Sequence, residues 1–242
     1  MSESLSPLAG ISPERRRLLL QRLGIRPGAA VRGAVIPRAP RDGELPLSFA
    51  QQRLWLLHQL EPRSPAYNVP FAVRFEGGLS PALTAWAMTE IVRRHEALRT
   101  TFGARDGEPR QVIGAAAPVP APVVELSALP AAARERESAR LAAAEARRPF
   151  DVERGPLLRV LLLRQGTAEH LALLTMHHLV SDGWSMGLLV EEFCSLYAAG
   201  AAGRPPDLPE LAIQYADYAC WQRRQLRDGA FATGLEYWRQ RL

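Results

Sequence analysis

The stretch His177-His178-Leu179-Val180-Ser181-Asp182-Gly183 joins two segments of different character. Residues 171–176 before it are mostly apolar and predict a buried strand, whereas residues 184–193 after it have the pattern of an amphipathic helix. A loop between a strand and a helix lies at the edge of a sheet, where α/β proteins place reactive side chains. Histidine, whose ordinary pKa is close to neutrality, can act there as a base, an acid or a hydrogen-bond partner.

The same seven residues also fit simpler interpretations. Asp182-Gly183 is a common turn pair, and a histidine at the end of a strand is often structural. A metal site is not expected, because adjacent residues on a strand point to opposite faces, so that His177 and His178 do not easily share one ion. The sequence also has neither Cys-x-x-Cys nor His-Glu-x-x-His.

The composition is that of a globular protein. The chain has 242 residues, of which 47% are hydrophobic and 23% charged, enough for one large domain or two small ones. It has no apolar run of membrane-spanning length and no signal-peptide core, so we expect a cytoplasmic protein without a membrane partner. Cys194 and Cys220 fall in predicted helices and are expected to be buried thiols.

The positive charge is concentrated at the N-terminus. All thirty basic residues are arginine; residues 1–42 contain eight of them against three acids, whereas the rest of the chain is balanced. This distribution argues against a nucleic-acid partner, which would require a basic patch on the folded domain. Residues 12–24 predict a short basic helix, and residues 25–46 a linker. Residues 1–46 are either a solvated tail or a docking segment for an acidic partner.

The folded domain is predicted to start near Leu47. Ser48 and Gln51 fit a capping box that opens a helix ending near Leu60. The pattern then predicts a strand at 67–75, a helix from Ser80, a hairpin at 99–113, a charged helix at 130–148, a hairpin at 157–176, the helix from Trp184, and helices at 211–227 and 230–242. The irregular alternation indicates an α/β fold with a mixed, mostly antiparallel sheet covered by helices.

Four motifs occur in a fixed order along residues 47–242: SFAQQRLW at 48–55, RHEALRTTF at 94–102, HHLVSDGWS at 177–185 and YADYACWQ at 215–222. This series resembles the first four core motifs of the condensation domains of nonribosomal peptide synthetases, in the chloramphenicol-acetyltransferase-like superfamily. The resemblance implies formation of an amide between two thioesters carried on the 4'-phosphopantetheine arms of an upstream donor and a downstream acceptor carrier protein. It implies no metal and no cofactor bound by the domain itself.

The resemblance also assigns roles within the loop. The candidate catalytic residues are His178, His177, Asp182 and Gly183. His178 matches the active-site histidine, as a base for the attacking amine or as its hydrogen-bond partner, while His177 is expected to pack or hydrogen-bond within the loop. Asp182 matches a structural aspartate, with Arg94 as the expected ion-pair partner and Arg99 as the second candidate. Gly183 is expected to let the backbone approach a substrate closely. The residues expected to line the substrate tunnel are Ser181, Trp184 and Ser185.

The later motifs of the family, which form a second lobe, are absent from the 242 residues. We therefore expect an N-terminal lobe with little activity alone, and the C-terminal lobe as its partner. The motifs around Gln59-Leu60-Glu61-Pro62 and Trp184 are most similar to domains that take an L-configured donor, and His177 disfavours heterocyclisation. The alternatives are an epimerisation domain, a stand-alone acyltransferase or a non-catalytic docking module. If Met1 starts the natural protein, residues 1–42 are candidates to recruit an upstream part of the synthetase.

Overall fold

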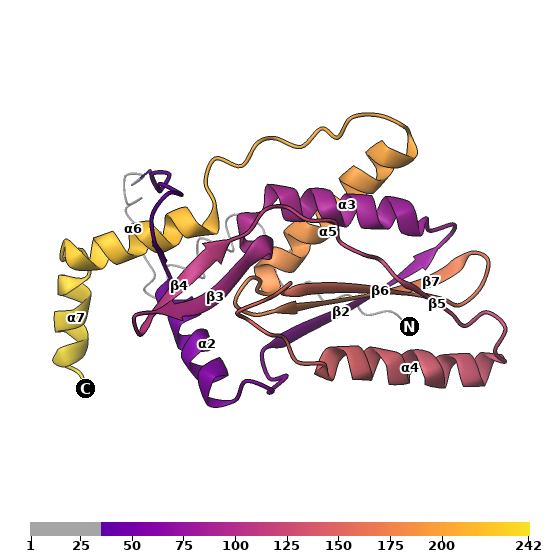
Figure 1. Cartoon of the computed structure of the whole chain (residues 1–242), viewed down its shortest axis with the longest axis horizontal. Helices are drawn as coiled ribbons and strands as arrows, with labels where there is room; N and C mark the ends of the chain where they lie inside the picture. Colours follow the sequence, from indigo (N-terminus) through magenta and orange to yellow (C-terminus); the bar gives the residue numbers. More distant parts are fainter. Residues whose placement is uncertain (1–34) are drawn as a thin grey trace, which may run out of the picture. The chain divides into compact units, whose positions relative to one another are not determined.

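The computed structural model describes residues 35–242, and the predicted basic helix at residues 12–24 lies outside them. One compact unit spans Pro37–Leu242 (Figure 1). It begins before Leu47, because residues 38–46 contact the rest of the unit through hydrogen bonds and a short strand. The sequence predicts a linker here because the segment is rich in proline, glycine and arginine. Composition does not reveal the contacts that residues 38–46 form with distant parts of the chain.

The larger sheet has the strand order β2-β7-β6-β5. β7 (Glu169–His177) is antiparallel to β2 (Asn68–Glu76) on one side and to β6 (Leu158–Arg164) on the other. The edge strand β5 (Val123–Glu125) runs parallel to β6 and was not predicted, since three residues after a proline-rich connector carry little pattern. The mixed, mostly antiparallel character of the sheet is confirmed.

Helices pack against both faces of this sheet (Figure 1). Val160, Leu162 and Met176 pack with α3 (Pro81–Arg94) and α5 (Gly183–Ala201) in the main core. Leu163 and Leu173 instead pack with α4 (Ala131–Arg147). Because alternate side chains of a strand point to opposite faces, burial on both sides explains why the strands β6 and β7 are nearly continuous apolar runs.

A smaller sheet lies apart from the main one, where the sequence predicts only a hairpin. β3 (Thr100–Arg105) and β4 (Glu108–Ile113) form that hairpin, and β1 (Leu45–Pro46) adds a third strand beside β4. The turn residues Asp106 and Gly107 have φ angles of 52° and 79°, which suits a tight two-residue connection. The short 3₁₀ helix η1 (Glu96–Arg99) connects α3 to this sheet.

Three more helices complete the unit. α2 (Phe49–Leu60) has the predicted capping box between Ser48 and Gln51, which is confirmed. α6 (Tyr215–Arg227) starts later than predicted, because Gln214 and Asp217 form a capping box there, and α7 (Ala232–Arg239) follows. Cys194 is exposed and Cys220 half-buried, so the prediction of buried thiols was wrong. Within residues 35–242, no helix combines the length and apolar character needed to span a membrane.

Candidate active site

The histidine loop is held by its own main chain. β7 ends at His177 and α5 starts at Gly183, as the sequence predicts for a strand-loop-helix junction. The His177 amide donates to the Leu157 oxygen at 3.0 Å, and the His178 amide donates to the Tyr67 oxygen at 2.8 Å. These bonds tie the loop to the residue before β6 on one side and to the residue before β2 on the other, so the position of the histidines is fixed at the end of the sheet.

His178 has an exposed side chain with a defined orientation. Its Nδ1 lies 2.7 Å from the main-chain oxygen of Ser181. Because a carbonyl oxygen only accepts, this hydrogen bond places the proton of the neutral ring on Nδ1. The lone pair is then on Nε2, which is the atom free to accept a hydrogen bond or a proton from a bound molecule.

His177 lies in a different environment, although it is the adjacent residue. Its side chain is 2% exposed, and its ring packs edge-on against those of His58 and Phe150. Its Nδ1 accepts a hydrogen bond from the Leu179 amide at 3.1 Å. Burial, together with the nearby His58 and His178, lowers the pKa of His177 to about 4, so its ring is neutral at pH 7. This residue holds the loop from inside.

A cavity of about 250 Å³ lies beside His178, between α2, the histidine loop and the start of α6. The sequence-predicted site residues that line it are His178, Ser181, Asp182 and Ser185. Sequence reasoning missed Tyr215, although it belongs to the fourth motif. The Tyr215 hydroxyl lies 3.0 Å from Ser48 Oγ, and burial raises the pKa of Tyr215, which keeps this hydroxyl protonated. We name this space the His178 cavity.

Asp182 acts as the N-cap of α5 and forms no ion pair with an arginine among the described residues. Its Oδ1 accepts from the Ser185 amide at 2.8 Å and from the Ser185 hydroxyl at 2.7 Å. These bonds hold the pKa of the Asp182 carboxyl below its usual range. The expected pair with Arg94 or Arg99 was therefore wrong: an exposed carboxylate at a helix start is satisfied locally and needs no distant cation.

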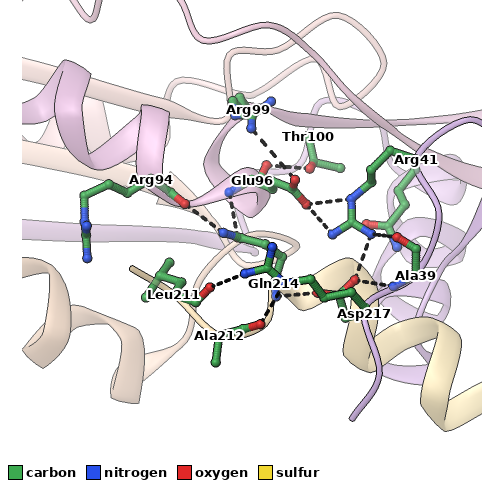
Figure 2. A network of polar contacts seen from close by, with 12 residues as sticks. Ala39, Arg41, Arg94, Glu96, Arg99, Thr100, Leu211, Ala212, Gln214 and Asp217 are labelled. Carbon is green, nitrogen blue, oxygen red and sulfur yellow. Dashed lines mark hydrogen bonds and ion pairs between the residues drawn. The ribbon is translucent and has the colours of Figure 1, made fainter. Parts of the chain in front are cut away.

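The two arginines have other partners. The Arg94 guanidinium lies 3.3 Å from the Glu192 carboxylate on α5, and His95 Nε2 lies 2.9 Å from the same group. Both side chains of the Arg94–Glu192 pair are less than a tenth exposed. Arg99 donates to the Gly114 oxygen and lies 3.9 Å from Glu96. Figure 2 shows the Arg94 side chain pointing away from the polar network formed around Glu96 and Gln214.

A second buried carboxylate, Asp217, was not identified from the sequence. It is 1% exposed and accepts hydrogen bonds from the Ala39 amide, the Arg41 guanidinium and the Gln214 amide (Figure 2). Arg41 also binds Glu96 at 2.7 Å. Residues 38–41 thus form a strap across the start of α6, the helix whose first residue, Tyr215, lines the His178 cavity.

Gly183 and Trp184 do not line the His178 cavity. A Cβ added at Gly183 would meet no heavy atom within 4 Å, so the fold itself does not require glycine there. Trp184 is 89% exposed at the first turn of α5. In the described part of the chain, no three His, Cys, Asp or Glu side chains gather as a metal site would require.

With this geometry in place, comparison with known proteins identifies the family. Residues 41–242 match the family described as the condensation domain. The chain belongs to that family. Over 88% of its length it is 46% identical to a linear gramicidin synthase of Brevibacillus parabrevis, and over its whole length it is 45% identical to the phosphinothricin tripeptide synthetase PhsC of Streptomyces viridochromogenes. Condensation domains are the amide-forming acyltransferase domains of nonribosomal peptide synthetases.

Solved condensation-type structures share the fold. The starter condensation domain of the rhizomide synthetase RzmA matches with a TM-score of 0.75 and 26% identity over 83% of this chain. The X-domain from teicoplanin biosynthesis matches with a TM-score of 0.72 and 32% identity over 81% of this chain. The chain spans 48% and 41% of those two structures, and 3% and 22% of the gramicidin and phosphinothricin synthetase relatives.

Proposed function

We propose that this chain is the lobe of a condensation domain that supplies the active-site histidine for amide formation. The α-amine of an acceptor aminoacyl thioester attacks the carbonyl carbon of a donor acyl or peptidyl thioester. A C–N bond forms, the C–S bond breaks, the donor carrier's thiol is released, and the amine loses one proton. The geometry that supports this step most directly is that of the exposed His178, whose Nδ1 is bound to the Ser181 oxygen, which leaves Nε2 free to accept.

In this reaction His178 either takes the proton of the attacking amine as a base or orients that amine by a hydrogen bond. An α-amine has a pKa of about 7.7–8.0, so a sizeable fraction is already neutral near pH 7 and strong base catalysis is not required. Nε2 then accepts a hydrogen bond from the attacking amine and directs its lone pair at the donor carbonyl. Holding two tethered reactants in such a geometry is itself a large source of rate enhancement.

The substrates follow from the same proposal. Both are thioesters on the 4'-phosphopantetheine arms of upstream and downstream carrier proteins, and the domain binds no cofactor of its own. The donor is L-configured, in keeping with the motif around Trp184. Because the chain spans 48% of the RzmA domain, we propose that residues 1–242 form little product until a second lobe completes the site. Residues 1–42 remain the proposed contact for an upstream synthetase subunit, through their excess of arginine.

The experiment measures amide formation between two carrier-loaded thioesters by intact mass. It compares residues 1–242 with the same chain completed by a C-terminal lobe, each with and without His178→Ala. Because His178 is exposed, the substitution leaves the fold intact, and circular dichroism verifies this. We expect product only from the completed domain and a decrease of about 10²–10⁴-fold on His178→Ala if the histidine acts as a base.

The controls separate this proposal from its alternatives. An exposed substitution away from the cavity, Leu56→Ala on α2, is expected to leave the rate unchanged. Equal rates with and without His178 would remove the histidine from the chemistry. Carrier binding without product from any form would indicate a docking module, whereas inversion of the α-carbon of a recovered thioester would indicate epimerisation.

A further inference from the structure

A second cavity, of about 270 Å³, lies next to the His178 cavity. The two cavities share a wall made of Ala97, Val180, Ser181, Ser185 and Tyr215. A group bound beside His178 is thus separated from the second cavity only by these five residues. We name this second space the apolar cavity.

The apolar cavity has a buried base and an open mouth. Its base is formed by core residues that are each less than a tenth exposed, namely Ile91, Leu98, Met176 and Leu189. At its mouth, Leu188 is 44% and Ile213 37% exposed. This depth and lining match an aliphatic or aromatic side chain, whose burial against such residues is favourable.

The polar side chains that line the apolar cavity are already hydrogen-bonded, with one exception among the described residues. Gln214 binds the Arg94 oxygen and the Glu96 amide, Tyr215 binds Ser48, and His95 Nε2 binds Glu192. Ser185 donates to Asp182. The Ser181 hydroxyl is buried and has no partner in the part of the chain that the structure describes. A buried hydroxyl without a partner costs free energy, and such a group calls for a functional explanation.

We propose that the apolar cavity receives the apolar side chain of a thioester substrate bound at His178, and that Ser181 Oγ hydrogen-bonds a polar atom of the same substrate. This inference rests on the proposed function. The side chain and the thioester carbonyl carbon are both bonded to the same α-carbon, so a carbonyl held at His178 places that side chain near the shared wall. Ser181 then does two things: its main-chain oxygen orients His178 and its hydroxyl binds the substrate.

The chemistry specifies an apolar side chain, and the source is either the donor or the acceptor thioester. The first measurement is binding of glycyl, alanyl, valyl and leucyl pantetheine thioesters to residues 1–242, as free amines and as N-acetyl derivatives, by ligand-detected NMR. The second is kcat/KM of the completed domain with the same series, varied in the donor with a fixed acceptor and then in the acceptor with a fixed donor.

We expect affinity and kcat/KM to rise from glycyl to leucyl by at least about 10-fold in one arm only, since each buried methylene adds discrimination. Leu188→Trp, which narrows the mouth, is expected to lower the leucyl-to-glycyl ratio by about 10-fold. Ile213→Trp, on the opposite rim, should act alike if Leu188→Trp does not fold. The matched control Leu56→Trp, on the exposed face of α2, should leave the ratio unchanged. Ser181→Ala should weaken all members of the series by a similar factor.

Some results would overturn the inference without affecting the proposed function. Amide formation with equal kcat/KM across the series in both arms, or a Leu188→Trp ratio equal to that of Leu56→Trp, would show that no side chain enters the apolar cavity. Absence of amide from the completed domain would contradict the proposed function, while the binding series on residues 1–242 would still test the cavity. Binding to residues 1–242 that does not depend on the size of the thioester's side chain would contradict the proposed role of the apolar cavity.

Discussion

The His178 ring is oriented by a residue of its own loop: Nδ1 lies 2.7 Å from the main-chain oxygen of Ser181. Since the acceptor is a carbonyl, the orientation depends on the loop's path and not on the side chain at position 181. Two further hydrogen bonds hold the loop. Gln51 Nε2 donates to the Leu179 oxygen at 3.4 Å, and the Leu179 amide donates to His177 Nδ1. The His178 ring is thus preorganised by local contacts.

Substitution of Asp182 by alanine is expected to lower the free energy of unfolding by about 1 kcal/mol, the usual cost of losing a helix cap. The physical reason is that the Asp182 carboxylate accepts from the Ser185 amide and hydroxyl, and both then lose a partner. Asp182→Ser, which can still cap α5, should restore most of the loss. Urea denaturation of the three proteins measures the difference.

The double-mutant cycle of Asp182→Ala with Arg94→Ala is the matching control. Arg94 faces the buried Glu192, so its loss is expected to cost about 3 kcal/mol or more by leaving that carboxylate without its guanidinium. The two losses should add, because the residues have no partner in common. A coupling energy above about 1 kcal/mol would instead support a direct Asp182–Arg94 pair.

Local patterns in the sequence predict much of this fold. The capping box at Ser48, the Asp106-Gly107 turn and the apolar runs of β6 and β7 are each encoded within a few residues. Elements that depend on distant contacts were not predicted. β1 is two residues long and exists because it pairs with β4, and β5 exists because it pairs with β6.

The site shows the same division. The strand-loop-helix placement of His178 follows from the sequence, but the partners of its charged neighbours do not. Glu192 and Asp217 lie on helices among apolar residues, and no short-range signal says that one reaches Arg94 across the α3–α5 interface while the other meets the strap at residues 38–41. The predicted pair of Asp182 with Arg94 connected two motifs whose charged side chains have other partners: Asp182 binds Ser185, and Arg94 binds Glu192.

Asp217→Asn is expected to destabilise the chain by about 2–3 kcal/mol and to release the strap. One carboxylate oxygen accepts from Ala39 and Arg41 while the other accepts from the Gln214 amide, and an asparagine has a single oxygen for both tasks. Limited trypsin digestion reads out the strap directly, since cleavage after Arg38 and Arg41 should become faster. Mass spectrometry locates the cleavage sites.

The matched control is Glu44→Gln, a substitution close to the strap in sequence that removes the ion pairs of the exposed Glu44 with Arg105 and Arg110. Exposed pairs contribute little, so unfolding and cleavage should change only slightly. Equal cleavage rates in the Asp217→Asn and unmodified chains would contradict the anchoring role of Asp217.

His177 makes the stability of the chain depend on pH. Its pKa is about 4 in the folded state, through burial, against 6.5 for the free side chain. Between these values the unfolded chain binds a proton that the folded chain does not, so stability is complete above about pH 6.5 and decreases as the pH falls toward 4. The total loss is about 3 kcal/mol, at 1.36 kcal/mol per pKa unit. Urea midpoints between pH 4 and 7 measure it.

Replacement of His177 by asparagine should flatten this slope, whatever its effect on absolute stability, whereas the exposed control substitution Leu56→Ala should retain it. His58 adds a smaller pH dependence of the same sign, since burial also lowers its pKa.

The carboxylates Asp217 and Glu192 contribute to the pH dependence of stability at lower pH than the histidines. Burial raises their pKa values, but hydrogen bonds from their partners outweigh it and lower them, so their contribution is lost below about pH 4. An unchanged slope in His177→Asn would show that the ring is protonated as readily in the fold as in the unfolded chain, which would contradict a neutral His177 ring packed against Phe150.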